Sequence, residues 1–340
     1  MPKSMTYAKA GVDIDKKSSS IAALVEHLKY KRKGFGKPID LPGHFTGLID
    51  FGDLALTLCT DGVGTKLVVA DALQKWDTVG IDCIAMNVND TICVGSEPIA
   101  FVDYIAIDRP NEKITSEVGK GLEEGARLSN MTIVGGEIAV LPELVNGFDL
   151  AGTCLGVVEK KRIVTGETIQ AGDALIGLPS SGIHSNGLTL ARKIFKENRI
   201  GYKEKVGGLS RSVGLELLEP TTIYVKQVLK LLDKHEVRGM ANITGGGLRN
   251  LIRLKKGIGF EIDDPMKPQP IFKVMQELGN VTDQEMYQVF NMGMGYCLVV
   301  PDDIAERVAK DAGKGAKVVG HAVKREGIRA PGLRLNYSKY

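Results

Sequence analysis

The sequence predicts a two-domain α/β protein, and three observations point to that fold class. The chain has 340 residues, which is too many for one ordinary domain of roughly 100–200 residues. A hydrophobic fraction of 43% and a charged fraction of 25% are typical of a globular protein with a large buried core. Strand-like and helix-like patterns alternate along both halves, so we expect two α/β layers side by side.

The first half opens with 50 residues that are rich in glycine, lysine and serine and show little periodicity. A strand is then expected at Asp53–Thr60, where Leu54, Leu56 and Leu58 alternate with smaller residues. Thr78–Val94 is apolar on most sides, which indicates a buried helix. The other elements expected in this half are strands at Phe101–Ile107, Thr132–Val134 and Asp149–Val158, a helix at Glu117–Ser129, and a loop at Gly135-Gly136-Glu137.

A polar stretch from Thr165 to Asp173 interrupts the alternation and is expected to separate the domains. We place the boundary after residue 167, which gives domains of residues 1–167 and 168–340. The second half then repeats the alternation. Its expected strands are Ala174–Leu178, Gly259–Ile262, Gly295–Val300 and Lys317–His321, and its expected helices are Leu188–Asn198, Thr221–His235, Gln269–Leu278 and Ile304–Ala312.

Composition and charge argue against several classes of function. A net charge of +3, from 44 basic and 41 acidic residues, gives no support for a nucleic-acid or membrane partner. The basic run from Lys29 to Lys37 fits a solvated loop or a mobile loop that reaches a phosphate. The five cysteines follow no CxxC spacing, so we expect buried free thiols in a reducing compartment. The sequence shows neither a signal peptide nor a membrane-spanning stretch, so a cytoplasmic protein is expected.

The most informative segment is Thr60-Asp61-Gly62-Val63-Gly64-Thr65-Lys66, which follows a predicted strand. Its two glycines carry no side chain, so backbone N–H groups can approach phosphate oxygens closely. Asp61 can hold Mg²⁺, and Lys66 can place a positive charge beside the phosphates. The segment is not a P-loop, and no GxGxxG stands between a strand and a helix. An ordinary glycine turn with surface charges is the alternative.

Polar side chains interrupt the apolar helix expected around residues 81–90. Asn87 and Asp90 lie three residues apart and share a face, and Asp82 lies eight residues before Asp90 on the same side. Carboxylates inside an apolar helix are costly unless they are paired or bound to metal. We therefore favour a Mg²⁺ site here over a hydrogen bond between helices.

Two segments of the second half also suggest ligand contacts. In Ser180–Gly187, the residues His184, Ser185 and Asn186 precede an amphipathic helix whose N-terminus could bind an anion. A helix cap and a hydrogen-bonded loop histidine are the alternatives for these three residues. Further on, Gly245, Gly246 and Gly247 expose a run of backbone amides, which fits an anion site or a plain tight turn.

These segments, in this order, resemble the family of aminoimidazole ribonucleotide synthetase. Asp61–Lys66 resembles the ATP-binding element that this family shares with formylglycinamidine ribonucleotide synthetase, selenophosphate synthetase and thiamine-monophosphate kinase. Asp90–Pro98 keeps the spacing of the shared Asp-x4-Gly-Ala-x-Pro signature, with Ser96 in place of the alanine. The segments that single out the synthetase family are Tyr7–Asp15, His184–Gly187, Leu218–Tyr224, Thr244–Gly247 and Glu285–Gly293.

The resemblance implies an ATP-dependent cyclo-ligase of purine biosynthesis. Such an enzyme closes formylglycinamidine ribonucleotide to aminoimidazole ribonucleotide and releases ADP and phosphate. The N-terminal domain would bind ATP with Mg²⁺, and the C-terminal domain would bind the ribonucleotide. The resemblance also implies a homodimer in which strands of the two N-terminal domains pair into a shared barrel, with the ATP site near the interface.

The same resemblance implies roles for individual residues. Asp61 and Asp90 would be the Mg²⁺ ligands. ATP would be held by Gly62, Gly64, Thr65, Lys66, Asp90 and Glu137, and the ribonucleotide by His184, Ser185, Asn186, Gly245, Gly246 and Gly247. The catalytic groups would be His184, Asp61 and Lys66.

The chain departs from the family pattern at two places. Ile138 and Val140 stand where the family has a polar and an acidic residue, and the glycine loop near the N-terminus is altered to Pro42–Gly47. A non-catalytic ATP-binding paralogue is therefore one alternative. A small-molecule kinase of the thiamine-monophosphate kinase type is the other, because it would share the elements around Asp61 and Asp90.

Overall fold

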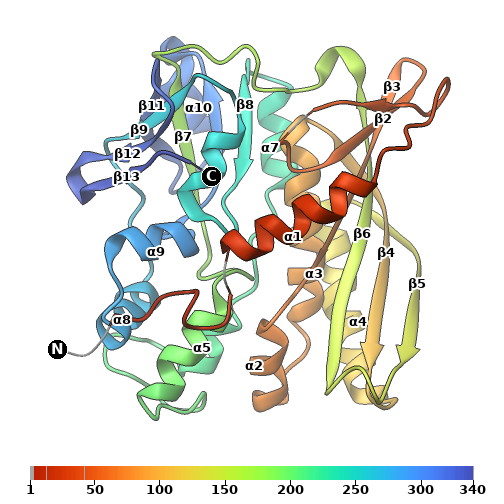
Figure 1. Ribbon diagram of the computed structural model, residues 1–340, viewed down its shortest axis with the longest axis vertical. Helices are drawn as coiled ribbons and strands as arrows, with labels where there is room; N and C mark the ends of the chain where they lie inside the picture. Colours follow the sequence, from red (N-terminus) through yellow and green to blue (C-terminus); the bar gives the residue numbers. More distant parts are fainter. Residues whose placement is uncertain (1–3, 13, 42, 340) are drawn as a thin grey trace.

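The computed structural model describes residues 4–12, 14–41 and 43–339, and it contains two β-sheets with helices packed against them (Figure 1). The first sheet takes its strands from the first half of the chain and the second sheet from the second half. The predicted class is confirmed at the level of a mixed α/β fold with two sheets. Asp13 and Pro42, which belong to two of the segments quoted above, lie outside the described residues.

The first sheet has six strands in the order β1-β2-β3-β6-β4-β5, and β4–β5 is its parallel pair. The strands are β1 (Pro38–Ile39), β2 (Gly47–Phe51), β3 (Leu54–Gly62), β4 (Glu97–Ile107), β5 (Thr132–Val140) and β6 (Phe148–Glu159). The helices of this half are α1 (Ile14–His27), α2 (Lys66–Leu73), α3 (Val79–Thr91), α4 (Glu112–Ser129) and the 3-10 helix η1 (Ile92–Val94). Helices α3 and α4 pack against each other and cover one face of the sheet (Figure 1).

The second sheet has seven strands in the order β13-β12-β9-β11-β7-β10-β8, and β9–β12 is its parallel pair. The strands are β7 (Ala174–Pro179), β8 (Gly239–Asn242), β9 (Gly259–Ile262), β10 (Met294–Val300), β11 (Lys317–Val323), β12 (Gly327–Ala330) and β13 (Leu335–Tyr337). The α-helices are α5 (Leu188–Glu197), α6 (Val213–Leu217), α7 (Val225–Leu232), α8 (Pro270–Gly279), α9 (Asp283–Val289) and α10 (Ala305–Ala312). The 3-10 helices of this half are η3 (Gly247–Arg253), η4 (Asp302–Ile304) and η5 (Pro331–Leu333), and η2 (Lys160–Arg162) directly follows β6 in the first half.

The expected loop at Gly135-Gly136-Glu137 is wrong, because these residues lie inside strand β5. Gly136 pairs with Asp103 of β4, and a Cβ at Gly136 would lie 2.5 Å from the Asp103 carboxylate. The absence of a side chain at Gly136 therefore leaves room for the Asp103 side chain between β4 and β5. The glycine does not make a turn. The helix expected at Thr221–His235 is also shorter than predicted, since α7 begins at Val225 and the preceding residues contact the other domain.

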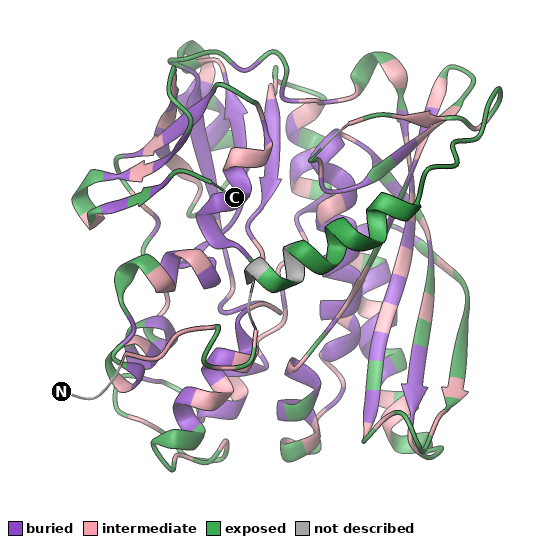
Figure 2. Ribbon diagram, in the orientation of Figure 1, coloured by how far each residue is buried: buried purple, intermediate pink, exposed green. Residues whose placement is uncertain are grey.

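Helix α3 lies between the first sheet and the second domain, and nearly all of its residues are buried (Figure 2). The predicted apolar helix is thus confirmed, although its last turn is the 3-10 helix η1. All five cysteines are buried and free, as predicted. Among the described residues, no helix is long and apolar enough to cross a membrane.

Candidate active site

The segment Asp61–Lys66 connects the end of β3 to the start of α2, at the seam between the two domains. Asp61 Oδ1 accepts a hydrogen bond from the next backbone N–H at 2.7 Å. Gly64 has a φ of +68°, which favours glycine, and its position has open space around it. The Thr65 hydroxyl lies 3.1 Å from the hydroxyl of Thr189 at the start of α5. The loop therefore leaves backbone atoms accessible and touches the second domain.

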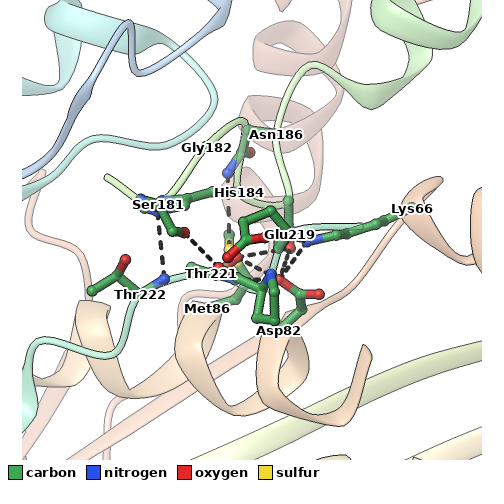
Figure 3. A network of polar contacts seen from close by, with 12 residues as sticks. Lys66, Asp82, Met86, Ser181, Gly182, His184, Asn186, Glu219, Thr221 and Thr222 are labelled. Atoms are coloured by element: carbon green, nitrogen blue, oxygen red, sulfur yellow. Dashed lines mark hydrogen bonds and ion pairs between the residues drawn. The ribbon is translucent and has the colours of Figure 1, made fainter. Parts of the chain in front are cut away.

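Lys66 differs from the expectation that its ammonium group contacts ATP phosphates. Its side chain is fully buried, and its Nζ donates to Asp82 Oδ1 at 2.8 Å and to the Glu219 carbonyl at 2.6 Å (Figure 3). Burial lowers the pKa of the Lys66 amine, and the charge of Asp82 opposes that shift. An ammonium group enclosed between α3 and the second domain is occupied within the protein, so the geometry points away from a phosphate contact.

The polar side chains of α3 connect separate parts of the chain. The Asn87 amide donates to the Asp61 carbonyl at 3.1 Å, which fixes the end of β3 against the helix. The Asn89 amide donates to the Thr222 carbonyl at 2.8 Å and accepts from the Tyr224 N–H at 3.0 Å. Asn87, Asn89 and the paired Asp82 therefore make structural hydrogen bonds, which is the alternative to the expected metal site.

Asp90 is the α3 carboxylate that remains suited to a metal ion. Its Oδ1 accepts a hydrogen bond from the Asn242 amide at 2.8 Å. Burial raises the pKa of Asp90 to about 7, and the nearby charge of Asp61 adds to that increase. Two neighbouring carboxylates whose charges repel each other suit a divalent cation, which would relieve the repulsion. No group of three or more metal-binding side chains occurs in the described part of the chain, so phosphate oxygens or water would have to complete the coordination.

His184 lies in the tight loop between β7 and α5 and is nearly completely buried. Its Nε2 accepts hydrogen bonds from the backbone N–H groups of Ser181 at 3.3 Å and Thr222 at 3.4 Å (Figure 3). Burial and the neighbouring charge of Lys66 lower the pKa of His184 to about 3. A neutral imidazole that holds two loops together matches the hydrogen-bonded loop histidine considered above, and it is poorly placed for proton transfer to a ligand.

We expect His184→Asn to gain stability relative to the unmodified protein as the pH falls. An unfolded histidine protonates near pH 6.5, whereas His184 in the folded protein has a pKa of about 3. Between these values only the unfolded state binds the proton, so the unmodified protein loses up to about 1.4 kcal/mol of unfolding free energy per pH unit through this residue. Asparagine does not titrate, and it tolerates the φ of +60° at this position.

Thermal denaturation of the two proteins between about pH 7 and about pH 4.5 would measure this difference. A gap in Tm that stays constant over the range would contradict a buried neutral imidazole. Because the comparison is between two proteins that share all other titrating groups, shifts from Asp90 cancel.

Ser185 and Asn186, which follow His184, have different surroundings. The Ser185 hydroxyl donates to Asp82 Oδ1 at 3.1 Å and therefore belongs to the buried contacts between the domains. Asn186 lies beside the glycine run, since a Cβ at Gly245 would be 3.0 Å from the Asn186 Oδ1. Gly245 is exposed, whereas Gly247 has a φ of +54° and its missing Cβ would collide with the Tyr287 carbonyl. Gly245 is therefore the exposed residue of the run, whereas Gly246 and Gly247 are buried.

The glycine loop is adjacent to the carboxylate pair, because Asn242, which binds Asp90, precedes it by three residues. The structure thus brings Asp61, Asp90 and the loops at Gly64 and Gly245 to one seam between the domains. The sequence analysis did not name Asn242 as a site residue. Its place three residues before a glycine run was the one available signal.

Glu137 does not join this group within one chain. It pairs with Tyr104 of β4, which pairs with Ala151 of β6, which in turn pairs with Gly62 of β3. Three strand spacings of about 4.8 Å separate Glu137 from Gly62, or roughly 14 Å. Ile138 and Val140 follow on the same strand, so these departures from the family pattern also lie away from Asp61.

Two segments that single out the synthetase family contact each other across the fold. The Tyr7 N–H donates to Glu285 Oε1 at 2.6 Å. The altered glycine loop is also held in place, because Arg253 donates to the carbonyls of Gly43 and His44 and stacks on Phe45 at 3.9 Å. Both contacts join the N-terminal part of the chain to the second domain.

Two surface cavities of about 650 and 930 Å³ lie away from the carboxylates. The first follows the domain seam around Leu54 and Val164, and the second lies beside Arg192 on α5. Neither is lined by Asp61 or Asp90. Cavity size therefore does not point to Asp61 or Asp90.

Comparison with known proteins shows the family of the chain. Residues 43–158 match the family described as AIR synthase related protein, N-terminal domain, and residues 170–331 match its C-terminal domain. A phosphoribosylformylglycinamidine cyclo-ligase of Methanococcoides burtonii is 51% identical over 334 residues, which cover 98% of this chain and 99% of that protein. The same enzyme of Methanosarcina barkeri is 51% identical over 332 residues, with 97% and 98% covered.

Solved structures of more distant proteins share the fold. The hydrogenase maturation protein HypE in complex with ATP aligns with a TM-score of 0.61 at 16% identity, covering 84% of this chain and 85% of that one. Thiamine monophosphate kinase from Aquifex aeolicus aligns with a TM-score of 0.61 at 16% identity, covering 94% and 98%. At such identities the likeness shows the fold alone.

The fold and the two domain matches define an AIR synthase related protein, built from one N-terminal and one C-terminal domain of that class. The 51% identity to two cyclo-ligases, over almost the full length of each protein, then identifies the family within this class. The chain belongs to the phosphoribosylformylglycinamidine cyclo-ligase family.

Proposed function

We propose that this protein converts formylglycinamidine ribonucleotide and ATP to aminoimidazole ribonucleotide, ADP and phosphate in purine biosynthesis. The observation that carries the proposal is the 51% identity to cyclo-ligases over 98% of the chain. The convergence of Asp61, Asp90 and two glycine loops at one seam is consistent with it. Because all five cysteines are free and buried, we also propose a reducing, cytoplasmic setting.

The chemistry requires activation of a poor leaving group. The formyl amide oxygen attacks the γ-phosphorus of ATP, ADP leaves, and an iminophosphate forms. The amidine nitrogen then attacks the activated carbon, the five-membered ring closes, and phosphate departs with the original oxygen. Phosphoryl transfer depends mainly on positioning and charge neutralisation, so carboxylates for a metal ion and open backbone amides are the groups that such a site needs.

We propose Asp61 and Asp90 as the residues that would hold Mg²⁺. The raised pKa of Asp90 beside Asp61 supports them, because a divalent cation offsets the repulsion between the carboxylates. Mg²⁺ commonly uses one or two carboxylates together with substrate phosphates. When bound, it would supply positive charge that neutralises the phosphate oxygens.

We propose that the loop at Gly62, Gly64 and Thr65 binds the ATP phosphates through its backbone. The open space at Gly64 supports this role. The ribonucleotide would then lie against Asn186 and the loop at Gly245, Gly246 and Gly247, with its phosphate at the exposed Gly245 end of that loop. This places ATP on the first domain and the ribonucleotide on the second. The domain division at residue 167 is part of the same proposal.

We further propose a homodimer formed through the first sheet. The face of this sheet that points away from α3 is apolar and open, and Leu58, Val102 and Tyr104 on it are 52%, 42% and 43% exposed. Such a contiguous apolar face on a soluble protein generally marks an interface. Pairing of two such faces would give the shared barrel, and it would bring the exposed Glu137 of one chain toward its partner.

A kinase of the thiamine-monophosphate type is the second candidate, because such a kinase shares the fold. An ADP-release assay separates the possibilities. We expect ADP only when formylglycinamidine ribonucleotide is present, with one ADP per aminoimidazole ribonucleotide formed. ADP production with thiamine monophosphate would favour the kinase. Nucleotide binding without ADP production from either substrate would favour a non-catalytic paralogue.

A further inference from the structure

We propose that Lys66 and Asp82 are positioning residues, whose buried ion pair fixes the nucleotide loop against the second domain, and that Lys66 does not contact ATP. The inference rests on the proposed function, because it assumes that ATP binds to the loop at Gly62–Thr65. It assigns Lys66 a different role from the phosphate contact that its place in the sequence suggests.

The pair occupies the centre of a network that joins four segments (Figure 3). Asp82 Oδ1 accepts hydrogen bonds from Lys66 Nζ at 2.8 Å, from the Thr221 N–H at 2.8 Å, from the Thr221 hydroxyl at 2.6 Å and from the Ser185 hydroxyl at 3.1 Å. Lys66 Nζ also donates to the Glu219 carbonyl at 2.6 Å. The side chains of Lys66 and Asp82 are both 0% exposed.

The covalent neighbours of the pair explain why its position matters. Lys66 is the first residue of α2 and directly follows the nucleotide loop. Asp82 is on α3, which also carries Asp90 and is bonded through Asn87 to the Asp61 carbonyl. Ser185 and Thr221 belong to the second domain. A displacement of the pair would therefore shift the loop, the metal ligands and the ribonucleotide side relative to one another.

Removal of only one charged partner from this network is expected to destabilise the fold. A buried ion pair that loses one member leaves an uncompensated charge without water, which is strongly destabilising. Replacement of both members by neutral groups is far less harmful, because no charge remains to be solvated. A residue whose role is to bind a phosphate behaves differently, since neutralising its protein partner cannot restore a lost ligand contact.

The test compares Lys66→Met with the double variant Lys66→Met/Asp82→Asn. Asparagine keeps an oxygen that can accept the bonds of Thr221. We expect Lys66→Met to lower Tm by roughly 5–10 °C and to reduce kcat/KM for ATP by about tenfold or more. The double variant should regain most of both losses. Lys75→Met, which breaks the exposed pair with Asp77, is the matched control and should change neither quantity.

Several results would overturn the proposal. If the double variant regains Tm while KM for ATP stays raised, Lys66 is a phosphate ligand. If neither quantity recovers, or if Lys66→Met behaves like the unmodified protein, the charge pairing is not what positions the loop. Should Lys66→Met fail to fold, folding of the double variant supports the proposal and its failure overturns it. The Tm values do not depend on turnover, so a wrong reaction assignment would show separately as absent ADP release in the unmodified protein.

Discussion

Asp90→Asn is expected to lower turnover by roughly a hundredfold or more while the fold is retained. The substitution removes one of two proposed Mg²⁺ carboxylates but keeps an oxygen that can accept the Asn242 hydrogen bond of 2.8 Å. Burial and the Asp61 charge already disfavour the ionised form of Asp90, whose pKa is raised to about 7. A neutral amide therefore removes repulsion, and we expect Tm to be unchanged or higher.

The combination of lost turnover and retained Tm is the informative result. Turnover and Tm should be measured together over a series of Mg²⁺ concentrations. Asp263→Asn, an exposed carboxylate that contacts His321, is the control and should behave like the unmodified protein. Full activity of Asp90→Asn at low Mg²⁺ would show that Asp90 is not a metal ligand. A large fall in Tm would instead indicate a structural role.

Leu58→Glu/Val102→Glu is expected to convert a dimer to a monomer at micromolar protein concentration. These residues lie on the open apolar face of the first sheet and are 52% and 42% exposed in the single chain. A carboxylate buried at an interface without a partner is costly, and two chains would bring four of them together. The same substitutions in a monomer would place charges in water at little cost.

Sedimentation velocity of the variant and the unmodified protein measures this effect. Val68→Glu is the matched control, because Val68 is also apolar and 43% exposed but lies on α2 and not on the sheet face. Its mass in solution should equal that of the unmodified protein. A monomeric unmodified protein would contradict the proposed dimer. A variant that remains dimeric would place the interface on another surface.

The elements with strong local patterns could be predicted from the sequence. The alternation around Leu56 predicted β3, and the nearly continuous apolar character of residues 78–94 predicted α3. The pair at Gly135 and Gly136 misled the prediction, because glycine serves close strand packing as well as turns. Which use applies depends on the Asp103 side chain on a neighbouring strand, which local sequence does not reveal.

The motifs of the candidate site did not predict the direction of its side chains. Asp61 and Asp90 are both hydrogen-bonded near the contact between the domains, and their role as metal ligands stays a prediction. Lys66 follows a glycine loop, and from the sequence its ammonium group could face a ligand or the protein interior. The answer depends on Asp82, sixteen residues further on, and on the second domain. The burial of His184 likewise depends on Thr222, which the sequence places 38 residues away.

The contacts of α3 also constrain how a substrate can enter. A hinge that rotated one domain away from the other would have to separate Asp82 from Thr221 and Asn89 from Tyr224. A hydrogen bond to a charged group contributes about 1.5–3 kcal/mol and a neutral one about 0.5–1.5 kcal/mol, so an open form that lacks these bonds would be a minor population at any moment. Ligand entry and product exit should then rely on segments outside this seam. The exposed helix α1, which crosses the front of the molecule in Figure 1, is the segment best placed to move without breaking it.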